Sequence, residues 1–255
     1  MVFDFFKDIF ELALSVTMLF FLIHRYVRWR RPHLSPAVQE HRLIILLVLA
    51  LILTGIKVSD SALTGASGPM DKAFLLFVHH HVPTVFVSIF EMITLSGSFN
   101  FLCPVLAVTT LLLLGFKRWF DFLLLAASAI CGALTVYGLK SLTGRERPAL
   151  WETRWYWGTS FPSGHTLETA CVGMALALCL GRIWPKQLRL FRISALVWLL
   201  LVGSSRLILG VHWPSDVLAA ACIGLLLPVM IQFVLRFWLG LEPTRPTSKE
   251  PAREN

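Results

Sequence analysis

The sequence consists of long uncharged apolar segments separated by short clusters of charged residues. Only helices and closed barrels satisfy their backbone groups in lipid, and these segments lack the apolar–polar alternation of barrel strands. The pattern therefore predicts an all-α integral membrane protein with a core of six transmembrane helices. A span needs about 20 residues, so the shorter segments must include their polar flanks. The segments are 43–56, 92–116 (with Pro104 as an expected kink), 122–139, 169–181, 193–205 and 217–235.

The first 27 residues form an additional hydrophobic segment of a different kind. Asp4, Asp8, Glu11 and Ser15 recur at helical spacing and give its first half a polar stripe. A short uncharged stretch follows. An N-terminal hydrophobic helix is therefore expected, either as a seventh span or as an amphipathic helix at the interface, and we favour the span.

Composition supports a membrane protein over a soluble one. Hydrophobic residues make up 56% of the chain and charged residues only 15%, whereas a globular domain carries about 25% charge. The net charge of +8 is compatible with nucleic-acid binding, but the basic residues cluster at the ends of apolar segments, where topology and anionic lipids explain them better. We therefore expect the lipid bilayer as a partner, no nucleic acid and no obligate protein partner.

The distribution of Lys and Arg predicts the orientation and the domains. Basic clusters occupy one set of connections, which the positive-inside rule places in the cytoplasm of a multi-pass protein of the cell (inner) membrane. Residues 58–84, 140–165 and 207–214 then face the extracytoplasmic side. The expected parts are an N-terminal hydrophobic helix with a basic loop (1–41), a membrane-embedded domain (42–238) and a polar cytoplasmic tail (239–255).

Three motifs that carry chemistry fall on the expected extracytoplasmic side. They are Lys140-Ser-Leu-Thr-Gly-Arg-Glu-Arg147-Pro, Pro162-Ser163-Gly164-His165 and Ser205-Arg206 followed by His212-Trp-Pro-Ser-Asp216. Lys140, Arg147 and Arg206 can balance the charge of a phosphate, and the arginines can bind it bidentately. Ser163 and Gly164 begin a helix whose backbone N–H groups suit an anion. Arg145 either adds charge to this site or faces water.

The two histidines supply the remaining parts of a phosphoryl-transfer reaction. Asp216, four residues after His212, can hold the imidazole in the tautomer whose other nitrogen attacks phosphorus. The product would be a phosphohistidine. His165 would protonate the leaving oxygen and later activate water, while the cations stabilise the transferring group without a metal or cofactor. Each residue alone has an ordinary explanation as a helix cap or a snorkelling helix end. Their joint occurrence in order favours the phosphate site.

The pattern Lys-x6-Arg-Pro, Pro-Ser-Gly-His and Ser-Arg-x5-His-x3-Asp resembles the phosphatidic acid phosphatase type 2 superfamily from Lys140 to Asp216. The similarity in helical layout extends over about residues 42–238. The resemblance implies that His212 is the nucleophile, oriented by Asp216, and that His165 is the acid. It also implies a set of phosphate-binding residues: Lys140, Arg147, Ser163, Gly164 and Arg206. The chain is most similar to bacterial phosphatases of undecaprenyl pyrophosphate or phosphatidylglycerophosphate.

The expected function is hydrolysis of a phosphomonoester or pyrophosphate of a membrane lipid, without a metal. Undecaprenyl pyrophosphate is the first choice of substrate, followed by phosphatidylglycerophosphate and phosphatidic acid. A lipid-to-lipid phosphotransferase would use the same site, and radiolabel in lipid instead of free phosphate would identify it. A transporter ranks below both, because it predicts ionisable residues near the centres of the apolar segments and none lies there. His79–His81 do not suggest a metal site, since consecutive helical side chains diverge.

Overall fold

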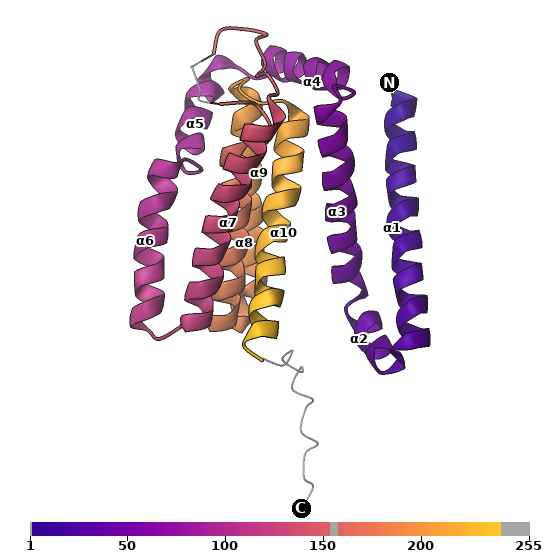
Figure 1. Cartoon of the computed structure of the whole chain (residues 1–255). Coiled ribbons are helices and arrows are strands. Elements are labelled where there is room, and N and C mark those ends of the chain that lie inside the picture. Colours follow the sequence, from indigo (N-terminus) through magenta and orange to yellow (C-terminus); the bar gives the residue numbers. More distant parts are fainter. Residues whose placement is uncertain (1, 154–157, 241–255) are drawn as a thin grey trace, which may run out of the picture.

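The computed structural model describes residues 2–153 and 158–240, with side chains from residue 6 onward. Most of the expected tail therefore lies outside the described residues. Within the described part the secondary structure is helical, and the helices run up and down side by side (Figure 1). In chain order they are α1 (Val2–Arg30), η1 (Pro32–Leu34), α2 (Ser35–Glu40), α3 (Arg42–Leu63), α4 (Gly68–His81), α5 (Thr84–Leu95), α6 (Phe99–Gly115), α7 (Trp119–Thr143), α8 (Gly164–Ile183), η2 (Pro185–Gln187), α9 (Leu188–Ile208) and α10 (Pro214–Trp238).

The expected core of six transmembrane helices is confirmed in the described part of the chain. The six candidate spans are α3, the α5–α6 pair, α7, α8, η2 with α9, and α10. α8 lies at the centre of the bundle, since 61% of its most apolar stretch is buried against 11% for α3. It packs mainly against α9, α10 and α7. Its buried face is rich in Ala, Gly and Cys, small residues that let helices approach closely in lipid.

α8 and α10 approach each other closely at Gly224. A Cβ added there would lie 2.5 Å from the Leu167 carbonyl oxygen and 2.7 Å from the Ala170 Cβ. We expect Gly224→Ala to push α8 and α10 apart and to lower stability by about 1–3 kcal/mol, the usual cost of overpacking. Thermal unfolding of the detergent-solubilised protein measures this effect. Gly138→Ala on α7 is the matched control, because nothing lies within 4 Å of its added Cβ. Equal melting temperatures for the two variants would contradict the prediction.

The segment 92–116 differs from the expected single helix kinked at Pro104. The chain leaves the helix at residues 96–98, between α5 and α6, whereas Pro104 lies inside α6. Ser96 and Ser98 donate their hydroxyls to the Ile93 and Leu95 carbonyls at 2.7 and 2.6 Å, which offers the backbone an alternative to helical bonding. The break packs tightly, since a Cβ at Gly97 would lie 2.7 Å from Val202.

The N-terminal helix α1 packs against α3, parallel to the bundle (Figure 1). Lys57 of α3 donates to Asp8 at 2.8 Å and lies 3.8 Å from Glu11, so part of the polar stripe of α1 pairs with the core. α1 has 29 residues and thus a length of about 43 Å at 1.5 Å per residue. It is not among the six candidate spans. Its crossing of the membrane therefore stays a prediction.

The two ends of the bundle differ in what they carry (Figure 1). One end holds α4, residues 144–153 and 158–163 after α7, and residues 209–213; we call it the site end. The opposite end holds residues 31–41, 116–118 and 184–187 together with the end of α10. α4 lies across the site end and links α3 to α5.

Candidate active site

His212 is placed by the short connection between α9 and α10. The connection turns at Gly210, whose φ of +66° lies in the left-handed region that favours glycine. Val211 then bonds back to the Arg206 carbonyl at 3.2 Å, and α10 begins at Pro214, which lacks the N–H that a first helical position leaves unpaired. His212 therefore lies between the end of one transmembrane helix and the start of the next.

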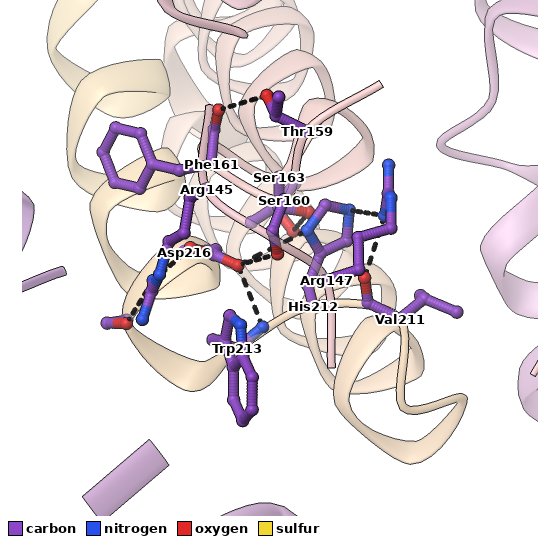
Figure 2. A network of polar contacts seen from close by, with 12 residues as sticks. Arg145, Arg147, Thr159, Ser160, Phe161, Ser163, Val211, His212, Trp213 and Asp216 are labelled. Carbon is purple, nitrogen blue, oxygen red and sulfur yellow. Dashed lines mark hydrogen bonds and ion pairs between the residues drawn. The ribbon is translucent and has the colours of Figure 1, made fainter. Parts of the chain in front are cut away.

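The imidazole of His212 is 2% exposed and has a defined neighbour on each nitrogen (Figure 2). Its Nε2 lies 3.2 Å from Arg147 Nη1, and its Nδ1 lies 3.7 Å from Asp216 Oδ2. Because a guanidinium only donates, Nε2 must accept, and the proton of the neutral ring is then on Nδ1. The 3.7 Å separation is longer than a hydrogen bond. Nε2 is thus the nitrogen with a lone pair, and the N–H faces the carboxylate.

The charge state of His212 suits a nucleophile. Burial lowers the pKa of His212 to about 3; the nearby guanidinium groups of Arg206 and Arg147 act in the same direction, and Asp216 opposes them. The ring is therefore neutral at neutral pH. Its Nε2 lone pair is engaged by Arg147, so a phosphate that draws Arg147 to its own oxygens would expose the nucleophile.

Asp216 is fully buried and held by three donors (Figure 2). Its Oδ2 accepts from the Ser160 hydroxyl and from the Trp213 backbone N–H at 2.9 Å. Its Oδ1 accepts from Arg145 Nη1. These bonds leave the carboxylate little freedom to rotate, and they keep one edge of it beside His212.

The three predicted cations gather around His212 and His165, and backbone or hydroxyl oxygens hold each of them. The Lys140 ammonium donates to the Thr159 carbonyl. Arg147 donates to the carbonyls of Gly158 and Val211 at 3.1 and 2.8 Å, and the fully buried Arg206 donates to the Thr94 hydroxyl at 2.6 Å. Thr94 lies in the last turn of α5, just before the break, so the interruption of that span places an acceptor for Arg206. Groups held in this way are preorganised for an anion.

The start of α8 supplies the second histidine. Ser163 is the residue before the helix, Gly164 its first residue and His165 its second. Gly164 permits close packing on α7, because a Cβ there would lie 3.3 Å from Val136 Cγ1. His165 is half-buried, and Lys140, Arg147, Arg206 and His212 all lie close enough to interact with it electrostatically. The first N–H groups of a helix have no intrahelical partner, so this start suits an anion.

All eight predicted site residues therefore lie at the site end, and three further residues join them. Sequence reasoning left the role of Arg145 open; the structure shows its guanidinium 12% exposed and bound to Asp216. Ser160 and Asp71 were not predicted at all. Ser160 precedes the second motif without a distinctive spacing, and Asp71 resembles any acidic residue in the first turn of a helix. No pattern in the chain marks either residue.

The arrangement can perform phosphoryl transfer. It combines a neutral imidazole whose Nε2 lone pair faces Arg147, a second histidine at a helix start and three cations. Within the described part of the chain, no group of three or more His, Cys, Asp or Glu side chains is arranged as a metal site.

Comparison with known proteins gives similarities that agree with each other. Residues 120–238 match the sequence model of the PAP2 superfamily. Phosphatidylglycerophosphatase B of Bacillus subtilis (strain 168) is 29% identical over 189 residues, which cover 73% of this chain and 91% of that relative. Phosphatidylglycerophosphatase B of Escherichia coli (strain K12) is 37% identical over 98 residues, 38% of this chain and 35% of that relative.

Two solved structures are similar in fold. A crystal structure of a transmembrane PAP2-type phosphatidylglycerolphosphate phosphatase from Bacillus subtilis has a TM-score of 0.70 and 27% identity, and the match covers 78% of this chain and 98% of that one. The crystal structure of Aquifex aeolicus LpxE has a TM-score of 0.52 and 22% identity, over 62% of this chain and 92% of that one. The second likeness shows the fold alone.

Proposed function

Because the chain is a multi-pass membrane protein of the PAP2 superfamily and a lipid phosphatase, we propose that it hydrolyses a terminal phosphate of a membrane lipid through a phosphohistidine on His212. The observation that carries this proposal is the environment of the imidazole. Its Nε2 faces the cations and its Nδ1–H faces Asp216. A neutral histidine held in this tautomer is an activated nucleophile.

In the first step, the Nε2 lone pair attacks phosphorus and the bond from phosphorus to the lipid oxygen breaks. His165 gives its proton to that oxygen, and the ring of His212 gains positive charge, which Asp216 stabilises across the 3.7 Å gap to Nδ1. In the second step, His165 takes a proton from water, the water oxygen attacks phosphorus, and the N–P bond breaks. Lys140, Arg147 and Arg206 stabilise the transferring group in both steps.

The position of the site supports a lipid substrate. His212 and His165 lie where transmembrane helices begin and end, at the depth where a headgroup would arrive while its tails stay in the bilayer. Undecaprenyl pyrophosphate is our first choice, and the name of the bacterial relatives adds phosphatidylglycerophosphate. Fold alone does not decide between them.

We place the reaction at the extracytoplasmic face of the inner membrane. The opposite end of the bundle carries the basic clusters, including Lys117 and Arg118 before α7, Arg182 in the last turn of α8 and Lys186 after it. The positive-inside rule assigns that end to the cytoplasm.

Phosphate release from a panel of lipid phosphates tests the proposal. The purified protein in detergent is expected to release free phosphate from at least one of undecaprenyl pyrophosphate, phosphatidylglycerophosphate and phosphatidic acid. The rate should be the same with and without a chelator, because the cationic side chains of the protein stabilise the transferring group. Activity lost in chelator and restored by a divalent ion would contradict the metal-free mechanism. Radiolabel transferred from donor lipid to acceptor lipid would instead identify a phosphotransferase.

A further inference from the structure

Arg145 lies between two buried carboxylates from different parts of the fold. Its Nη1 donates to Asp216, and its Nη2 donates to Asp71 Oδ2 at 2.8 Å. Asp216 is fully buried and Asp71 is 3% exposed. Asp71 belongs to α4, the helix that lies across the site end (Figure 1). A single guanidinium therefore connects α4 to the carboxylate that faces His212.

Asp71 also binds the start of α10 directly. Its Oδ1 accepts from the Ser215 backbone N–H at 3.0 Å, and its Oδ2 accepts from the Ser215 hydroxyl at 2.5 Å. Ser67 donates its hydroxyl to the same Oδ2 at 2.7 Å. Since Pro214 has no N–H, the Ser215 N–H is the first backbone donor of α10. The Asp71 carboxylate, 144 residues away in the chain, accepts its hydrogen bond. Asp71 thus stabilises the helix start that carries Asp216.

The charges of these groups explain why a second carboxylate is needed. Asp216 paired with Arg145 alone would form a neutral pair and would stabilise a cationic imidazole poorly. Asp71 adds a second negative charge to the same guanidinium, so that the group of three carries a net negative charge. During attack on phosphorus the ring of His212 becomes positive, and an acceptor with more negative charge stabilises it better.

We propose that Asp71 is a positioning residue of the phosphatase reaction, which holds Arg145 and the start of α10 so that Asp216 stays charged and directed at His212. This inference rests on the proposed function. It assigns α4 a part in catalysis although none of the proposed phosphate-binding residues belongs to α4. A purely architectural ion pair is the alternative, and it predicts a loss of folded protein without a change in the turnover of the protein that remains folded.

The test compares kcat and KM, per folded protein, of wild type, Asp71→Asn, Arg145→Gln and the double variant. We expect Asp71→Asn to lower kcat about ten- to a hundredfold, the range of a buried charge-assisted hydrogen bond, with KM within about twofold of wild type. The phosphate-binding cations are unchanged, which is why KM should hold. Because Asp71 acts in part through Arg145, adding Asp71→Asn to the Arg145→Gln variant is expected to lower kcat less than Asp71→Asn lowers it in wild type.

Asp121→Asn is the matched control. Asp121 is 1% exposed and pairs with Arg118 at 2.8 Å and Arg182 at 3.4 Å, but it begins α7 at the opposite end of the bundle. Its loss is expected to lower stability and to leave kcat per folded protein at the wild-type value.

Three outcomes would overturn the inference. They are an unchanged kcat in Asp71→Asn, an equal fall of kcat in Asp121→Asn, and a fall of kcat on Asp71→Asn that is as large in the Arg145→Gln variant as in wild type. An unchanged Asp71→Asn beside an inactive His212→Ala would refute this inference alone. A wild type that acts on no lipid phosphate would refute the proposed function and the inference with it.

Discussion

His212→Ala is expected to lower phosphate release by about 10⁴-fold or more on every lipid phosphate that the wild type hydrolyses. The reason is that the variant lacks the atom to which phosphorus is transferred, so it retains binding by the cations but loses the covalent path. Free phosphate measured over time gives the rate. Brief incubation with radiolabelled substrate should give an acid-labile, alkali-stable protein label in wild type and none in the variant.

His80→Ala is the control for this loss. His80 also lies at the site end, on α4, but it is exposed and its ring contacts His81 with centroids 5.1 Å apart. It should keep wild-type turnover and the protein label. Equal turnover of His212→Ala and wild type would overturn the assigned mechanism.

His165→Gln is expected to separate the two steps of the reaction. Loss of the acid should lower turnover of a lipid phosphate by about 10²–10⁴-fold, the usual contribution of a general acid–base. A substrate with a good leaving group, such as p-nitrophenyl phosphate, needs no proton in the first step, so phosphorylation of His212 should stay much faster. The second step still lacks its base. The phosphohistidine should therefore accumulate.

A burst experiment measures this accumulation. The variant should release about one nitrophenolate per active site rapidly and then turn over slowly, while the wild type reaches its steady rate without such a burst. Equal losses on both substrates with no trapped phosphohistidine would show that His165 does not act on the leaving oxygen and water.

Hydrophobic patterning was sufficient to predict the six spans, because lipid constrains them strongly. A backbone in the bilayer must satisfy its own polar groups, so the uncharged segment 122–139 had to be helical, and α7 extends over it (Trp119–Thr143). The break at Ser96–Ser98 could not be predicted in this way. Serine and glycine carry no charge and so leave the uncharged segment continuous. The choice between helix and local hydroxyl bonds depends on packing against α8 and α9.

The residues proposed for a phosphate site could also be selected from sequence, because a phosphate group requires particular side chains. It demands cations, a helix start and a nucleophile, and the motifs place all of these at one end of the bundle by helix parity alone. What these side chains bond to was not predictable. The contact of Arg147 with His212 Nε2 joins segments that are far apart in the chain. The same holds for the hydrogen bond from Arg206 to Thr94.

The sequence by itself determined that this protein is a helical membrane protein with the candidate phosphate-binding residues at one end, since few structures are stable in lipid and few side chains suit a phosphate. Only the tertiary structure decided how those residues are held. Asp71 meets Ser215 across 144 residues, and Arg145 joins two carboxylates that no periodicity connects. Burial makes these contacts necessary, because a charge removed from water is costly unless other groups of the folded chain pair with it.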